Sequence, residues 1–166
     1  STMFLEKLMA RLNNDKVGVV VFAGNAYSLM PITSDHSSAR LFISSANTGM
    51  VSEQGTAIGE ALELCRNSFT QNAKTQKAVI VITDAENRAD DAIAAAKETI
   101  DKGIQVNVAG VGTGDGAKIP TGNGQFLTDD NGNEVVTRLD EKTAREIAST
   151  GKGIYVSVTD NGAVDA

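Results

Sequence analysis

Residues 78–111 read AVIVITDAENRADDAIAAAKETIDKGIQVNVAGV, and this stretch decides the fold. Apolar runs at its two ends, 78–83 and 104–111, are rich in β-branched residues and predict two strands. Between them, Asp90-Asp91 favours the start of a helix and Gly103 favours its end. Strand, helix and strand in this order are typical of two parallel strands joined by a right-handed crossover. The stretch therefore predicts an α/β protein.

The same alternation of helices and apolar strands extends over the rest of the chain, so we expect one domain over residues 1–166. It would be a doubly wound, Rossmann-like α/β sandwich, with a mostly parallel sheet and helices on both faces. The glycine-rich residues 112–124 look unfit for helix or strand. The other expected elements are a helix at 4–12, a strand at 16–24, a short strand at 26–30 stopped by Pro31, helices at 35–46 and from Gly55-Thr56 to Phe69, a hairpin of about 125–139 turned at Asn131-Gly132, a helix at 141–150 capped by Asp140, and a strand at 153–158.

Composition excludes several classes of protein. The chain has 15 Lys and Arg against 21 Asp and Glu, for a formal net charge of −6, and it lacks the basic stripe of a nucleic-acid binder. Its longest apolar runs are far shorter than the roughly 20 residues that cross a bilayer, so we expect these 166 residues to be soluble. One cysteine, Cys65, and one histidine, His36, can form neither an internal disulfide nor a zinc cluster.

Two residues stand where ligands bind in open α/β sheets, beyond the carboxyl ends of the strands. Asp84 directly follows the apolar strand at 78–83, and Thr56 follows Gly55 at the start of a helix. A carboxylate and a hydroxyl, without thiolate or imidazole, suit a hard cation such as Mg²⁺. Each residue taken alone has a structural alternative, because Asp and Thr at these places also cap helices.

Several motifs resemble a known family over nearly the whole chain and in order. They are FAG-AY-PIT-D at 22–35, QGTAIG at 54–59, VIVITDAEN at 79–87 and the 122–141 stretch GNGQFLTDDNGNEVVTRLDE. This pattern resembles the von Willebrand factor A domains of the bacterial Bat (aerotolerance) proteins, most of all those of the BatB type. The resemblance implies a metal-ion-dependent adhesion site formed by D-x-S-x-S after the first strand, a Thr in a later loop and an Asp after the fourth strand.

By this resemblance the Thr corresponds to Thr56 and the Asp to Asp84. Two departures stand out. Ala85 occupies a position where the family usually has Gly, and D-x-S-x-S does not occur in the chain. Comparison with the family therefore places the first central strand, with the remaining metal ligands, upstream of Ser1. We expect these 166 residues to bind Mg²⁺ or Mn²⁺ weakly or not at all, because two oxygen ligands are too few to compete with water.

The function implied is that of a non-catalytic interaction module, in which an acidic residue of a protein partner completes the metal shell. By the same resemblance, the parent protein is anchored in the bacterial inner membrane by segments outside this chain and faces the periplasm. Its partners would be other Bat proteins or a MoxR-type AAA+ ATPase. Two alternatives stay open: a Mg²⁺-dependent phosphohydrolase of Rossmann-like fold with Asp84 as metal ligand, and a structural domain with a degenerate metal site.

Three other patterns are better explained by structure than by chemistry. The glycines at 110, 112, 114 and 116 follow a strand, but Ile119-Pro120 comes next instead of the helix that a dinucleotide loop requires. His36 and Cys65 lie in different elements and would pair only by accident of folding. The alternating polar residues at 129–133 lack the glycine and the distant Glu of a calcium loop, and turn formation accounts for them.

Overall fold

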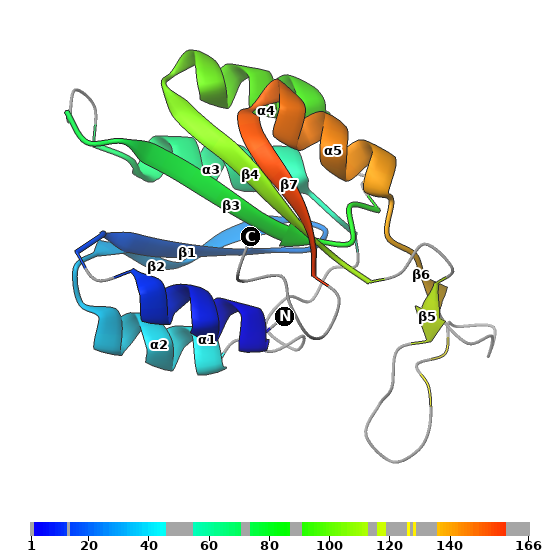
Figure 1. The fold of residues 1–166 in the computed structure, drawn as a ribbon, viewed down its shortest axis with the longest axis horizontal. Helices are drawn as coiled ribbons and strands as arrows, with labels where there is room; N and C mark the ends of the chain where they lie inside the picture. Colours follow the sequence, from blue (N-terminus) through cyan, green and yellow to red (C-terminus); the bar gives the residue numbers. More distant parts are fainter. Residues whose placement is uncertain are drawn as a thin grey trace.

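The computed structural model describes residues 2–12, 14–45, 55–70, 74–86, 91–112, 116–118, 126, 128 and 136–158. Helices and strands alternate along this part of the chain, as the sequence predicts (Figure 1). The elements are α1 (Thr2–Arg11), β1 (Val17–Phe22), β2 (Ala26–Thr33), α2 (His36–Ser45), α3 (Ile58–Ser68), β3 (Lys77–Thr83), α4 (Ala92–Asp101), β4 (Ile104–Val111), β5 (Ala117–Lys118), β6 (Val136–Thr137), α5 (Glu141–Thr150) and β7 (Lys152–Val158).

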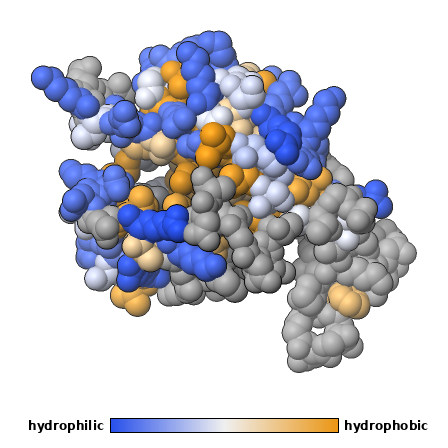
Figure 2. Space-filling model, in the orientation of Figure 1, coloured by the Kyte–Doolittle hydropathy of each residue, from blue (hydrophilic) through white to orange (hydrophobic). Residues whose placement is uncertain are grey.

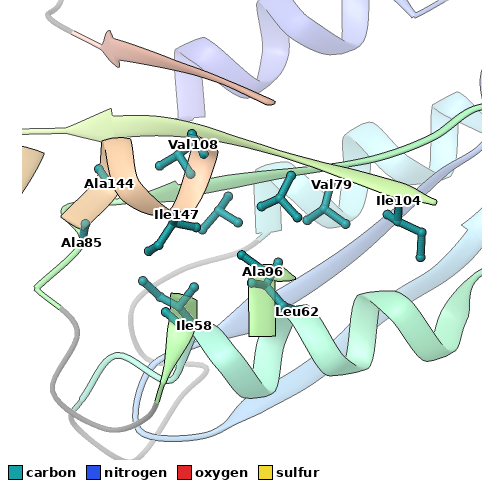
Figure 3. Packing of buried hydrophobic residues seen from close by; sticks show 13 residues of the cluster. Ile58, Leu62, Val79, Ala85, Ala96, Ile104, Val108, Ala144 and Ile147 are labelled. Atoms are coloured by element: carbon teal, nitrogen blue, oxygen red, sulfur yellow. The ribbon is translucent and has the colours of Figure 1, made fainter. Parts of the chain in front are cut away.

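The predicted crossover unit is present. β3 and β4 pair in parallel without a break from Lys77↔Ile104 to Thr83↔Gly110, and β7 pairs in parallel with the other edge of β4. Helices α3, α4 and α5 lie together behind this three-stranded sheet (Figure 1). Between the sheet and these helices lies the main core cluster, whose fully buried members include Ile58, Leu62 and Ile147 (Figure 3).

The remaining two strands form a separate sheet. β1 and β2 pair antiparallel, α2 packs against both, and Met9, Met30, Ala39 and Ile43 form a second core cluster there. This sheet lies on the β3 side of the three-stranded sheet, and α3 packs against strands of both (Figure 1). Within the described residues, however, no strand of one sheet is hydrogen-bonded to a strand of the other.

One face of the three-stranded sheet is only partly covered. Exposure alternates along β3, where Val79 and Val81 are buried and Ile80 is 42% exposed. Ile154 of β7 is 60% exposed. Figure 2 shows apolar residues gathered in the middle of the molecule on the side that faces away from α3–α5. The predicted strand at 78–83 is therefore buried on its helix face only, because α3–α5 pack against one side of this sheet.

Two strand predictions are wrong in part. β2 does not stop at Pro31 but continues to Thr33. Proline is tolerated because β2 is an edge strand whose pairing with β1 shifts register between Val17 and Val20, so a missing N–H costs little there. The stretch at 112–124 is also not free of strand, because β5 pairs antiparallel with β6.

The hairpin prediction has a mixed outcome. Its second arm is extended, since β6 is a strand, but the described partner of β6 is β5 instead of the expected arm at 125–128. Phe126 and Thr128 each form an isolated bridge. The predicted turn at Asn131-Gly132 lies outside the described residues.

Candidate metal centre

Asp84 leaves the carboxyl end of β3 and is held by backbone contacts on both sides. The Glu86 N–H donates to the Asp84 Oδ1 at 3.3 Å, which closes a short turn. The Asp140 N–H donates to the backbone oxygen of Asp84 at 2.8 Å. Asp140 also caps α5 by accepting a hydrogen bond from the Thr143 N–H at 3.0 Å. The start of α5 is thus fastened to the residue that carries the candidate ligand.

The electrostatic setting of Asp84 disfavours its negative charge. Burial is the main cause that raises the pKa of the Asp84 carboxyl, and the charge of Glu86 raises this pKa further. The hydrogen bond from the Glu86 N–H acts in the opposite direction but does not outweigh burial. Within the described residues, no Lys or Arg forms an ion pair with Asp84. A bound cation would supply the missing positive charge, so the position fits a metal ligand.

Ala85 has an unusual backbone conformation. Its φ is +58°, in the left-handed region that favours glycine, and its side chain is fully buried in the main core cluster. The Ala85 N–H donates to Thr83 Oγ1 at 3.0 Å, which fixes the turn. The turn after Asp84 therefore has a positive φ, which agrees with the glycine that the family resemblance leads us to expect at this position. Because alanine has a Cβ, this conformation is strained.

Thr56 lies in a loop that packs against the end of β1. Gly55 has a φ of +144°, and a Cβ there would lie 3.0 Å from the Cα of Gly24. The Ala57 N–H donates to the Ala23 oxygen at 2.6 Å. Helix α3 begins at Ile58 with Ala57 as its N-cap, and no side chain caps it. The structural alternative for Thr56, a capping hydroxyl, is therefore not realised, and the half-buried side chain is not engaged in starting the helix.

The two candidate ligands belong to the same end of the molecule. Figure 3 shows Ile58, Ala85 and Ala144 at one end of the main core cluster and Ile104 at the other. Ile58 follows Thr56 by two residues and Ala85 adjoins Asp84, so both loops lie at the carboxyl end of the three-stranded sheet. No group of three or more His, Cys, Asp and Glu able to hold a metal occurs in the described part of the chain. The donor chemistry fits a hard cation, while the described ligand set is too small for Mg²⁺.

The structure also shows contacts that sequence reasoning did not find. Asp140 and Glu86 brace the Asp84 turn, because a Glu86 Oε1 accepts from the Arg138 N–H at 3.4 Å and the Asp140 N–H bonds Asp84. On the other side, Glu60 of α3 accepts from the Ala26 N–H at 3.0 Å and ties α3 to β2. These contacts join residues 34 to 56 positions apart, and no local pattern signals them.

His36 and Cys65, which the sequence analysis does not assign to catalysis, have structural contacts. The Nε2 of His36 lies 2.7 Å from the Asp15 oxygen. Cys65 packs against the main core cluster, and burial raises the pKa of its thiol to about 11. Gly112 is followed by β5 with no helix between them in the described residues, so the glycine-rich segment has no described helix start on which to bind a phosphate.

Comparison with known proteins agrees with this architecture. The sequence model of the von Willebrand factor type A domain matches residues 2–165. The chain belongs to the von Willebrand factor type A (VWA) family. BatB from Bacteroides thetaiotaomicron is similar to this VWA domain, with 48% identity and a TM-score of 0.91 over 96% of this chain and 78% of that one. No curated protein matches the chain.

Two further solved structures are similar to this domain. An aerotolerance-related membrane protein from Bacteroides fragilis, solved with multiple mutations to serine, shares 48% identity with this VWA domain at a TM-score of 0.89, over 96% of this chain and 79% of that one. Proximal thread matrix protein 1 from the mussel byssus, solved with a zinc-occupied metal-ion-dependent adhesion site, shares the fold at 20% identity and a TM-score of 0.67, over 99% of this chain and 36% of that one. Among the described helices of this VWA domain, none is long and apolar enough to span a membrane.

Proposed function

We propose that this VWA domain is a non-catalytic protein-interaction module that holds a divalent cation through Thr56 and Asp84. The cation, Mg²⁺ or Mn²⁺, would present an open coordination position to an acidic residue of a partner protein. The observation that carries the proposal is the setting of Asp84, a half-buried carboxylate with a raised pKa and no described cationic partner. Such a group is unfavourable in the free protein and is stabilised by a metal ion.

The mechanism is coordination without turnover. Mg²⁺ takes six oxygen ligands in near-octahedral geometry and gives up its water reluctantly, so a site with few protein charges keeps several waters. The hydroxyl of Thr56 and the carboxylate of Asp84 would provide two of the six positions. Further ligands would come from outside residues 1–166, from a strand that we expect to lie between β1 and β3 and to end in D-x-S-x-S. A partner carboxylate would then replace one of the waters.

The wider setting is proposed on the likeness to BatB and to the aerotolerance-related membrane protein. We infer that the parent protein is anchored in the inner membrane through segments outside this chain, with the domain facing the periplasm. Other Bat proteins or a MoxR-type AAA+ ATPase would supply the acidic partner residue. The net charge of −6 gives no support to nucleic acid as a partner.

Calorimetric titration of Mn²⁺ into the full-length protein tests this proposal. Asp84→Ala should abolish binding without lowering the melting temperature of the metal-free protein, because a partly solvated carboxylate at a strand end contributes little packing. The matched control is Asp101→Ala, which removes an exposed carboxylate paired with Lys97 on α4. Equal loss of Mn²⁺ binding in both variants would contradict the proposal. Hydrolysis of para-nitrophenyl phosphate that disappears in Asp84→Ala would support the phosphohydrolase instead.

A further inference from the structure

The outer edge of β7 is unpaired in the described part of the chain. The three-stranded sheet has the order β3-β4-β7, so β7 bonds to β4 on one side only. The Ile154 N–H donates to Asn107 Oδ1 of β4 at 3.0 Å, which shows that this residue directs its N–H inward. The register of β7 against β4 shifts between Lys152 and Tyr155. From Ile154 onward backbone direction alternates along the strand, so the peptide groups of Tyr155 and Ser157 face the free edge. An edge of this kind can accept another strand.

A hollow of about 460 Å³ lies beside this edge, between α5 and β7. Figure 1 shows α5 running next to β7 at the outer side of the sheet. The hollow is lined by Arg145, Ala148 and Ser149 of α5 and by Lys152, Gly153 and Tyr155 of β7. One of the residues that line it, Tyr155, has backbone groups that face the free edge. The helix and the free edge thus border one groove.

The groove is basic in a protein of net charge −6. Its two charged residues, Arg145 and Lys152, are both cations. The Arg145 guanidinium lies 4.4 Å from the centre of the Tyr155 ring, which holds it at the groove. Its Nε also donates to Glu141 Oε1 at 2.9 Å, one turn away on α5. Because that ion pair is exposed it is weak, and an incoming carboxylate can replace Glu141.

From these observations we propose that the α5–β7 groove binds an extended acidic segment of a partner protein by adding a strand to β7. The backbone of the segment would bond to the outward peptide groups of Tyr155 and Ser157. Its Asp or Glu side chains on one face would contact Arg145 and Lys152. Main-chain bonds would supply affinity for any extended segment, and the two cations would select acidic ones. This site does not depend on the proposed metal centre, since none of its lining residues adjoins Thr56 or Asp84.

Fluorescence anisotropy on the full chain tests the proposal with a dye-labelled, terminally blocked nonapeptide of alternating Val and Glu. The same peptide with Lys in place of Glu is the chemical control. The Glu peptide should bind, more weakly as NaCl is raised, and the Lys peptide should not. Arg145→Glu and Lys152→Glu should each weaken binding by about fivefold to tenfold, because each replaces an attraction with a repulsion. Lys142→Glu, an exposed change on α5 that does not line the groove, should have a much smaller effect.

The backbone contribution is tested separately at Ser157. Ser157→Pro removes one outward N–H and should abolish binding, whereas Ser157→Ala should not. The Tyr155 and Ser157 amides of the unchanged chain should also exchange hydrogen more slowly when the Glu peptide is present, which needs no variant to fold. Absence of binding by the Glu peptide, equal binding of both peptides, or unchanged exchange at these amides would overturn the proposal. Binding should persist in EDTA and in Asp84→Ala, so its failure is distinct from failure of the metal site.

Discussion

Replacement of Ala85 by glycine measures the strain stored beside the candidate metal ligand. A residue with a side chain in the left-handed region costs about 1–2 kcal/mol relative to its ordinary conformation. Glycine at position 85, where φ is +58°, would remove this cost. Against this gain, the change loses one buried methyl group, about 0.8 kcal/mol, and adds about 0.5–1 kcal/mol of backbone freedom to the unfolded chain. The terms nearly cancel, so Ala85→Gly should change the free energy of unfolding by less than about 1 kcal/mol.

The matched control is Ala96→Gly. Ala96 is as fully buried as Ala85 but lies inside α4, where the helical backbone already suits alanine. Glycine there loses the same methyl group and about 1 kcal/mol of helix propensity, so we expect destabilisation by about 2 kcal/mol. Urea denaturation followed by circular dichroism measures both variants. If Ala85→Gly were as destabilising as Ala96→Gly, the turn after Asp84 would store no strain and the argument would fail.

Three further results are expected. Burial raises the pKa of the Asp84 carboxyl in the folded state. The protonated carboxyl therefore contributes its full stability below the ordinary pKa of 3.8, and this contribution is lost as pH rises through the raised pKa. In EDTA, Asp84→Asn should raise the melting temperature at pH 7 and should give no such gain near pH 3. Asp140→Ala removes the cap that accepts from Thr143 and should cost about 1 kcal/mol of unfolding free energy in urea titrations; no loss would exclude a capping role. With a pKa near 11, the Cys65 thiol should react with iodoacetamide at pH 8 about 100-fold more slowly than a cysteine of pKa 9, and equally fast reaction would contradict its burial.

The sequence predicts most of the fold because the decisive signals are local. Asp91 caps α4 by accepting from the Ala94 N–H, and Gly103 follows the helix with a φ of +76°, as the pattern indicates. Asp140 and Gly151 bound α5 in the same way. The strand that passes Pro31 and the pairing of β5 with β6 are not local, because they depend on which strand lies at an edge and which segment reaches it.

The candidate site is predictable only in part. The rule that ligands bind at the carboxyl ends of parallel strands selects Asp84, and the family resemblance adds Thr56. The positive φ of Ala85 and the bond from Asp140 to Asp84 are set by tertiary packing around the turn, so no sequence period carries them. Whether the two ligands hold a metal remains a prediction, because further oxygen donors have to join them.

Calorimetric titration of Mg²⁺ into two chains tests the central claim most directly. One chain comprises these 166 residues, and the other extends upstream through the strand proposed to lie between β1 and β3. Two oxygen ligands, Thr56 and Asp84, compete poorly with water, whereas a D-x-S-x-S motif would add a carboxylate and two hydroxyls. The account predicts weak or undetectable binding by the shorter chain and at least about tenfold tighter binding by the longer one. Equal affinities, or an upstream sequence without an acidic and serine motif, would contradict the assignment of the site.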